Sequence, residues 1–308
     1  MTLQQLEYIT AVDRLRHFGR AAELCGVTQP TLSAMVQKLE TELGVKIFDR
    51  NVQPVATTPV GSKIVEQAWR VIGDAAKIND IIDEERQSTD GTFRIGILPT
   101  IAPYLLPRFF PQLLAEHPGL DLRIVEMKTA EIKSELSKGT LDAAILVRTD
   151  GMDDFAATTL FYEQFLAYVA KGDTLYDSKC IRAADLTDEF LWLLGEGHCF
   201  RDQMMKFCEL QGAVNSTTTY SLGSIETFMR MVESGKGITF IPELALEQLS
   251  QAQRALVRPF AIPIPVREVI MLTTQPVVHR SMLQLLIDSV RRSVPPAMLR
   301  MNNTQQRI

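Results

Sequence analysis

Hydrophobic residues recur at helical spacing in three segments near the N-terminus. The first predicts a helix over residues 3–15, where an apolar residue occurs at every third position. The second predicts a short helix over residues 19–24, which ends at a glycine-containing turn. The third predicts a helix over residues 29–43, with Thr28 as its N-cap and Gly44 as its C-terminal stop. Three short helices in succession indicate a small helical domain.

The second and third of these helices, joined by a tight turn, have the spacing of a helix-turn-helix. The start and the polar side of the third helix supply the candidate DNA contacts Gln29, Pro30, Thr31, Ser33, Gln37 and Lys38. On this pattern alone two interpretations stay open, a DNA-reading helix or a helical bundle with a solvated polar face. Residues 47–50 and 54–58 predict a short extended wing beside it. We expect Lys38 and Arg50 to hold phosphates.

Residues 59–87 carry apolar side chains at three- and four-residue intervals and predict one long amphipathic helix. Its apolar stripe needs a partner, and a second copy of the chain is the economical one. From Thr92 onward, β-branched runs alternate with helical patterns, which predicts a parallel sheet with helices on both faces. The roughly 215 residues from Thr92 onward are more than one such sheet needs, so we expect two α/β lobes with a cleft between them. The polar residues after Met301 predict a frayed tail.

Composition narrows the class of protein. The chain has 308 residues, 46% hydrophobic and 22% charged, which is ordinary for a globular protein of two or three domains. The formal net charge is −5, and residues 1–63 carry seven Lys and Arg against six Asp and Glu. A DNA-binding surface must therefore be local and must depend on dimerisation. The N-terminus does not look like a secretion signal and no apolar run is long enough to span a bilayer, which predicts a cytoplasmic protein without membrane contact.

The four cysteines, Cys25, Cys180, Cys199 and Cys208, are too few for a disulfide framework in so long a chain. Thiol chemistry, metal binding and plain burial remain as interpretations. No His, Cys and Asp spacing is typical of a zinc site, and no phosphate-binding or dinucleotide motif occurs, so we expect neither a metal nor a cofactor. Without further context, burial as unreactive thiols is the simplest interpretation of all four.

Residues 17–50, HFGRAAELCGVTQPTLSAMVQKLETELGVKIFDR, closely resemble the helix-turn-helix of LysR-type transcriptional regulators. The resemblance covers the whole chain and includes residues 58–61, which sit like the LTxAG stretch of that family. Residues 194–208, LGEGHCFRDQMMKFC, together with PTIAPYLLP at 99–107, resemble the peroxide-sensing subgroup. The HCxRDQ motif with Cys208 nine positions after its cysteine is a specific signature of that subgroup.

The resemblance implies a role for individual residues. Cys199 would be the peroxidatic thiol and Cys208 the resolving thiol that closes a reversible disulfide, whereas Cys25 and Cys180 keep the interpretation of unreactive thiols. The peroxide pocket would be lined by Thr100, Thr129, His198 and Arg267, with Arg201 and Asp202 in support. The implied partners are double-stranded DNA, hydrogen peroxide, further copies of the chain in a dimer or tetramer, RNA polymerase and a cellular disulfide reductant. Such a protein is a transcription activator of the oxidative-stress response and not an enzyme.

Geometry makes the two cysteines a candidate switch. The thiolate is the reactive form, and His198 and Arg201 are the local candidates for lowering the pKa of Cys199. Nine helical positions would separate the Cα atoms of Cys199 and Cys208 by about 13 Å, whereas a disulfide tolerates less than about 7 Å. We therefore expect oxidation to unwind or relocate part of residues 200–209 and to change a dimer interface.

The predicted fold is an α/β effector domain of two lobes, similar to periplasmic binding proteins, preceded by an all-α winged helix-turn-helix domain and a long linker helix. The predicted ranges are 1–60 for DNA binding, 61–90 for the linker and dimerisation helix, and 91–303 for the regulatory domain, with lobe I at 91–162 and 268–303 and lobe II at 163–267. The nearest rival function is a LysR-type regulator whose cleft binds a small metabolite. A thiol peroxidase would not need a DNA-binding arm of about 90 residues, and a periplasmic solute-binding protein would need a signal peptide.

Overall fold

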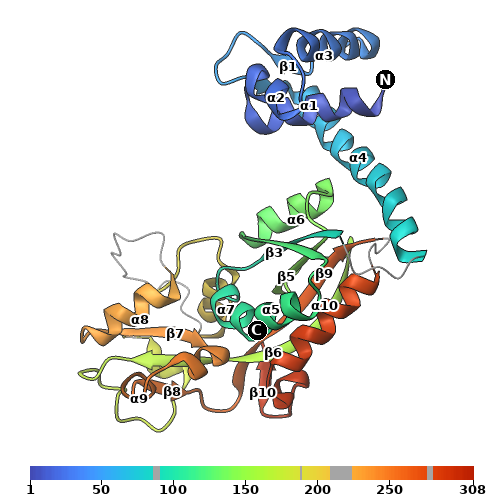
Figure 1. The fold of residues 1–308 in the computed structure, drawn as a ribbon. Coiled ribbons are helices and arrows are strands. Elements are labelled where there is room, and N and C mark those ends of the chain that lie inside the picture. The colour runs from blue at the N-terminus through green and yellow to red at the C-terminus, as the bar shows by residue number, and fades with distance from the viewer. Residues whose placement is uncertain (86–90, 188, 209–223, 276–279) are drawn as a thin grey trace. The chain divides into compact units, whose positions relative to one another are not determined.

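The computed structural model describes residues 1–85, 91–187, 189–208, 224–275 and 280–308. The chain divides into two compact units, one containing residues 1–86 and the other most of the remainder. The first unit is built mainly of helices, and the second combines a sheet with helices (Figure 1).

The helical unit consists of three short helices, a small hairpin and one long helix. Its elements are α1 (Leu3–Leu15), α2 (Phe18–Leu24), α3 (Gln29–Leu43), β1 (Phe48–Asp49), β2 (Ala56–Thr57) and α4 (Pro59–Glu85). The three predicted short helices are confirmed, with α2 beginning one residue early. The Thr28 hydroxyl accepts a hydrogen bond from the Thr31 N–H, and Gly44 ends α3 in the left-handed conformation at φ 69°. The predicted wing is the antiparallel pair of β1 and β2.

One apolar core holds the helical unit together. Ile9 and Val12 of α1 pack with Leu32, Val36 and their neighbours on α3, all fully buried. The start of α4 packs directly on the segment before the wing, since a Cβ on Gly61 would come within 2.0 Å of the Ile47 carbonyl oxygen. Any residue larger than glycine would push the linker helix and the wing apart.

The second unit is a two-lobed α/β domain. Its elements are β3 (Gly91–Ile97), α5 (Ala102–Glu116), β4 (Leu120–Glu126), α6 (Thr129–Lys138), β5 (Ala143–Val147), β6 (Phe155–Val169), η1 (Ala183–Leu186), α7 (Cys199–Phe207), α8 (Ile225–Glu233), β7 (Ile238–Pro242), η2 (Glu243–Gln248), α9 (Gln251–Arg254), β8 (Val257–Pro259), β9 (Ile264–Thr274), α10 (Arg280–Ser293), η3 (Pro296–Leu299) and β10 (Gln305–Arg307). The strand order is β4-β3-β5-β9-β6-β7, with β10 beside β9 and β8 beside β6.

The long strands β6 and β9 connect the two lobes. They pair antiparallel from Phe155 opposite Thr274 to Gln164 opposite Val266. From Phe165 onward β6 leaves β9 and pairs with β7 and β8 instead. The first half of β6 therefore belongs to one lobe and the second half to the other.

The prediction of a parallel sheet is confirmed for three strands and wrong for the strands that follow them. Strands β3, β4 and β5 are parallel, as the alternation of strands and helices predicted. Strand β9 is antiparallel to both β5 and β6. Strand β9 enters the sheet between β5 and β6 from the C-terminal part of the chain, and its direction depends on this distant pairing and not on the local alternation of strands and helices.

The prediction of a frayed C-terminal tail is also wrong. Residues 305–307 form β10, which pairs in parallel with β9. A guanidinium nitrogen of Arg307 donates to Glu268 on β9 at 2.7 Å. The polar side chains of this tail are thus used in pairing, a role that composition alone does not reveal.

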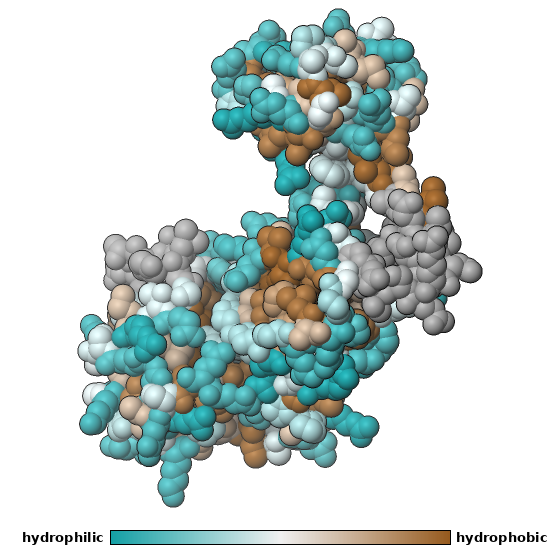
Figure 2. All heavy atoms as spheres, viewed as in Figure 1, coloured by the Kyte–Doolittle hydropathy of each residue, from teal (hydrophilic) through white to brown (hydrophobic). Residues whose placement is uncertain are grey.

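Helix α4 leaves apolar side chains exposed. Val71 is 38% exposed and Ile78 63%, and brown surface follows this helix in Figure 2. No helix in the described parts of the chain is long and apolar enough to cross a membrane.

Candidate functional site

Helix α3 presents the predicted DNA contacts from one element. Five of the six are exposed, namely Gln29, Pro30, Thr31, Gln37 and Lys38, and Ser33 is half-buried. The hydroxyl groups of Thr28 and Thr31 lie 2.8 Å apart at the start of the helix, which holds that turn in place. The geometry is that of a helix whose N-terminal and polar face is free to enter a groove.

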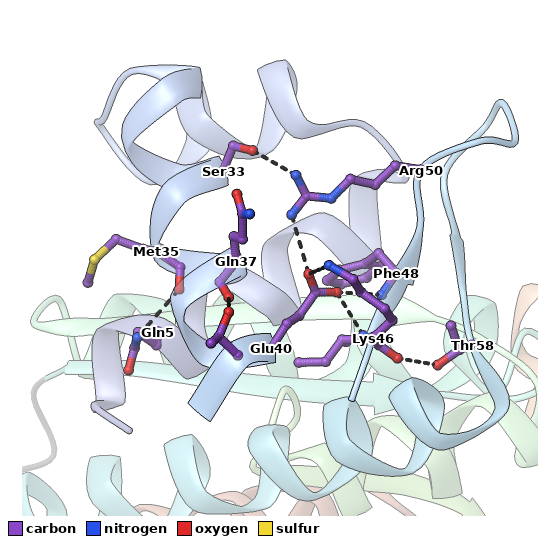
Figure 3. Close-up of polar contacts among 11 residues, drawn as sticks. Gln5, Ser33, Met35, Gln37, Glu40, Lys46, Phe48, Arg50 and Thr58 are labelled. Carbon is purple, nitrogen blue, oxygen red and sulfur yellow. Dashed lines mark hydrogen bonds and ion pairs between the residues drawn. The ribbon is translucent and has the colours of Figure 1, made fainter. Parts of the chain in front are cut away.

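Arg50, at the start of the wing, contacts α3 (Figure 3). One terminal nitrogen donates to the Ser33 hydroxyl at 3.0 Å, and the other lies 3.5 Å from a carboxylate oxygen of Glu40. The guanidinium also lies over the Phe18 ring, 4.7 Å from its centroid. The side chain is nevertheless 37% exposed. A cation at the surface is therefore fixed beside the reading helix.

Glu40 is a polar residue that the sequence analysis missed. Its side chain is 1% exposed and accepts hydrogen bonds from the backbone N–H groups of Ile47 at 2.8 Å and Phe48 at 3.2 Å. Lys46 and Arg50 add cations at 3.5 Å (Figure 3). A buried carboxylate thus fixes the connection between α3 and the wing. The signal was available, because Glu40 follows Val36 by four residues on the apolar stripe.

Cys199 opens α7 in the other unit. Its side chain is buried with a free thiol, and it lines a cavity of about 1510 Å³ together with Asp202, Gln203 and residues of the C-terminal strand. Phe200 and Met204 are buried in the adjoining core and anchor the helix. The thiol therefore lies inside the domain, on the wall of a cavity that can admit a small oxidant.

Arg267, on β9, is the cation that acts on the Cys199 thiol, and it is fully buried. It donates to the Thr100 hydroxyl at 3.2 Å and to the Thr100 carbonyl oxygen at 3.0 Å. Its guanidinium lies near the Phe165 and Phe200 rings, at 5.9 Å and 5.3 Å from their centroids. The structure thus brings Thr100, Arg267 and the start of α7 together, although they are far apart in sequence.

The surroundings of Cys199 shift the pKa of its thiol in opposite directions. Burial raises the pKa of this thiol, and Asp202 adds to the increase. The Arg267 cation, the Thr129 hydroxyl and the Phe200 N–H lower it by favouring the thiolate. Burial is the largest of these influences, so the pKa of the Cys199 thiol lies above its ordinary value. The cation that lowers the pKa of Cys199 here is Arg267, which the sequence analysis placed in the pocket without this role.

The remaining predicted pocket residues surround the start of α7. Thr129 begins α6, and its buried hydroxyl oxygen makes no hydrogen bond of standard geometry within the described residues, although it lies near enough to the thiol to favour the thiolate. His198 is the half-buried N-cap residue, and burial together with Lys128 lowers its pKa. Arg201 is half-buried and Asp202 exposed. The unpartnered Thr129 hydroxyl is suited to a ligand that can donate or accept a hydrogen bond.

Cys208 is the residue that ends α7. It is buried, its thiol is free, and burial raises its pKa to about 12. The nine-residue helix from Cys199 to Phe207 keeps the two Cα atoms about 13 Å apart, as predicted. Cys180 is exposed and Cys25 half-buried. The two cysteines of the motif are thus the two least accessible ones.

The C-terminal strand adds a contact to α7 that the sequence did not predict. The Gln203 side-chain amide donates to the Ile308 carbonyl oxygen at 2.6 Å. The Gln203 carbonyl oxygen is buried without a partner among the described residues. Part of the helix between the two cysteines is therefore tied to β9 through β10.

Both parts of the chain match known protein families. Residues 3–62 match the model of the bacterial regulatory helix-turn-helix protein, lysR family, and residues 86–295 match the LysR substrate binding domain. The chain therefore belongs to the LysR family of bacterial transcriptional regulators. Within that family it is similar to OxyR proteins, which confirms the resemblance found in the sequence.

The similarity to OxyR proteins spans nearly the whole chain. The DNA-binding transcriptional dual regulator OxyR of Escherichia coli K12 is 35% identical over 269 residues, which cover 87% of this chain and 88% of that protein. A full-length OxyR mutant of Pseudomonas aeruginosa is 37% identical, with a TM-score of 0.77, over 94% of this chain and 98% of that one. A Corynebacterium glutamicum OxyR mutant with hydrogen peroxide bound is 27% identical, with a TM-score of 0.61, over 95% and 92% of the two chains.

Proposed function

We propose that this protein is a DNA-binding transcriptional regulator that senses hydrogen peroxide by oxidation of Cys199 and reversible disulfide formation with Cys208. The observation that carries the proposal is the setting of the Cys199 thiol, near the Arg267 cation and the unpartnered Thr129 hydroxyl and on the wall of a cavity. Relatives named as hydrogen peroxide-inducible genes activators support it. So does the peroxide-bound neighbour.

The first chemical step consumes peroxide at Cys199. The thiolate attacks one peroxide oxygen, the O–O bond breaks, and the other oxygen leaves as hydroxide, which is protonated to water. Cys199 becomes a sulfenic acid. Arg267 stabilises the thiolate, while the Thr100 and Thr129 hydroxyls, with His198, orient the peroxide. Arg201 and Asp202 support the turn that carries the thiol.

In the second step, disulfide formation couples oxidation to a conformational change of α7. The Cys208 thiolate attacks the Cys199 sulfur, an S–S bond forms, and the sulfenic oxygen leaves as water. A separation of about 13 Å along an intact helix exceeds the reach of a disulfide, about 7 Å. Helix α7 therefore has to unwind. The burial that raises the pKa of Cys208 to about 12 also has to be relieved before this thiol reacts.

The DNA-binding role rests on the first unit. Gln29, Pro30, Thr31, Ser33 and Gln37 contact base edges in the major groove, while Lys38 and Arg50 contact phosphates. Residues 1–60 form the DNA-binding domain, 61–90 the dimerisation helix and 91–303 the regulatory domain. The exposed Val71 and Ile78 on α4 support a homo-oligomer, a dimer or tetramer, whose geometry changes on oxidation. RNA polymerase and a cellular disulfide reductant are the further partners, and no enzymatic turnover is needed.

One observation favours a second function. The cavity beside Cys199 measures about 1510 Å³, which is far larger than hydrogen peroxide and large enough for a small metabolite. A metabolite-responsive regulator would use this space with its cysteines incidental.

The redox dependence of DNA binding separates these functions. We would measure footprints on an operator for the reduced and peroxide-treated wild-type protein and for Cys199→Ser, with Cys180→Ser as the matched control. The proposal predicts that peroxide changes the footprint of wild type and Cys180→Ser and leaves Cys199→Ser unchanged. A peroxide-dependent change that persists in Cys199→Ser would contradict it by placing the sensing at another group. A footprint that peroxide leaves unchanged in wild type would contradict it and favour the metabolite-responsive regulator.

A further inference from the structure

A fully buried carboxylate lies behind the cation of the cysteine pocket. Glu163 on β6 stands directly opposite Arg267 on β9 in the strand ladder. One Glu163 oxygen lies 2.8 Å from Nε of Arg267 and 2.6 Å from a terminal nitrogen, and both side chains are 1% exposed. The other oxygen accepts the Leu244 N–H at 3.0 Å. Both oxygens of this carboxylate are thus used, one to hold Arg267 and the other to hold the neighbouring backbone.

The contacts of Glu163 fix the direction of Arg267. With Nε and one terminal nitrogen held by Glu163, the guanidinium is left to face Thr100 and to lie beside the packed Phe165 and Phe200 rings. Glu163 also sits at the point where β6 leaves β9 for the second lobe. The cation of the pocket is therefore positioned from the junction between the lobes.

The pair of Glu163 and Arg267 also determines how much positive charge acts on Cys199. The groups that act on this thiol from the surrounding elements are Arg267 on β9, Thr129 on α6 and Asp202 on α7. His198 and Lys128 lie by the N-terminus of α7 and act on each other. Around the pair itself, Tyr104 on α5 and Glu243 on η2 interact with Glu163. Since Glu163 offsets the charge of Arg267, the pair as a whole carries no net charge.

We propose that Glu163 is a positioning and charge-balancing residue for Cys199: it holds the Arg267 guanidinium in place beside the start of α7 and offsets its charge, which weakens its attraction for the thiolate. The role of Glu163 in peroxide sensing rests on the proposed function. Its effect on the ionisation of the Cys199 thiol can be measured without peroxide.

The first test replaces only the charge. Glu163→Gln keeps the size of the side chain and an acceptor oxygen but leaves the buried Arg267 cation unbalanced. We expect the ratio of thiolate to thiol at Cys199 near neutral pH to rise about tenfold, which corresponds to one pKa unit. The readout is the pH profile of thiolate ultraviolet absorbance, taken as the difference between each full-length reduced protein and its Cys199→Ser counterpart. An unchanged or raised pKa in the folded variant would overturn the proposal.

The matched control is Glu268→Gln. Glu268 is the next residue on β9, is 3% exposed, and is paired with Arg148 at 2.9 Å and Arg307 at 2.7 Å. Its charge is balanced by Arg148 and Arg307 and not by Arg267, so its loss should leave the thiol titration unchanged. A shift as large as that of Glu163→Gln would assign the effect to general loosening of the sheet and would overturn the proposal.

A second measurement covers the case in which Glu163→Gln does not fold. Cys199→Asp places a permanent anion where the thiolate would form. We expect it to lower the melting temperature in the wild-type background, where Glu163 already balances Arg267, and to raise it or restore folding in the Glu163→Gln background. The same sign of effect in both backgrounds would overturn the proposal. Absence of Cys199 oxidation by peroxide in the wild type would instead refute the proposed function and leave these results standing.

Discussion

Two arginine–glutamate pairs, one in each unit, use the same chemistry in opposite settings. In both, the carboxylate is buried and accepts backbone N–H groups, at Ile47 and Phe48 for Glu40 and at Leu244 for Glu163. The arginines differ. Arg50 is 37% exposed, whereas Arg267 is 1% exposed.

Exposure of the arginine decides what the pair can do. A partly exposed guanidinium can also bind an external anion such as a DNA phosphate, in competition with water and salt. A buried guanidinium is shielded from solvent ions, so it responds mainly to charge that appears inside the domain. The first pair is suited to binding DNA and the second to sensing ionisation of a thiol.

The largest expected loss in the free energy of unfolding comes from replacing Arg267, the cation of the buried pair. Arg267→Met would leave Glu163 buried without its partner, which costs about 3–5 kcal/mol. Arg148→Met is the control, because Arg148 is 33% exposed and its partner Glu268 keeps Arg307 and Thr159. Urea denaturation of both reduced variants measures the difference. Equal losses would contradict the distinction between buried and surface cations.

The buried carboxylate of the first pair should come next. Glu40→Gln removes the charge that accepts two backbone N–H groups, and we expect a loss of about 1.5–3 kcal/mol, the usual range for hydrogen bonds to charged groups. Glu42→Gln is the control on the same helix, because Glu42 is exposed. Thermal unfolding compares them. A loss as small as that of the control would show that Glu40 does not organise the wing.

Burial of the second cysteine should appear in the pH dependence of stability. Because burial raises the pKa of Cys208 from 9.0 to about 12, the neutral thiol stabilises the folded state below about pH 9, and that contribution is lost as the pH rises toward 12. The expected loss is about 1.4 kcal/mol per pH unit above 9. Denaturation of reduced wild type and Cys208→Ala across this range measures it. Parallel curves for the two proteins would contradict the burial argument.

The smallest effect on stability is expected at the exposed arginine. Arg50→Gln should change the free energy of unfolding by less than about 1 kcal/mol, because Arg50 is partly exposed and Glu40 keeps its two backbone N–H groups and Lys46. Its effect on DNA binding should be clearer, with the slope of log affinity against log salt reduced by about one. Operator titrations at several salt concentrations test this, with Arg16→Gln as an exposed control. A slope equal to that of wild type would exclude a phosphate contact.

Local patterns allowed much of the fold to be predicted. The apolar spacing from Leu3 to Leu15, the cap at Thr28 and the stop at Gly44 depend only on neighbours in sequence, and each is found where expected. The direction of β9 and the pairing of β10 depend on contacts between distant segments, which periodicity does not encode.

In the site, too, the features that depend on neighbours in sequence were predictable and those that depend on distant contacts were not. The motif around Cys199 identified the thiol, but the cation that acts on it, Arg267, comes from a strand 68 positions later in the sequence. Glu163 lies within an apolar strand, and its partner follows from the β6–β9 register alone. A charged residue inside an apolar run was the signal available, and it indicates a buried partner without saying which one.

The most direct test of this account is a brief stoichiometric pulse of hydrogen peroxide followed by mass spectrometry of all four cysteines. The account predicts that buried Cys199 reacts first and is recovered in a disulfide with Cys208, while exposed Cys180 stays reduced. Oxidation of Cys180 ahead of Cys199 would mean that exposure alone governs reactivity in this protein, and it would contradict the peroxide-sensing role of the pocket.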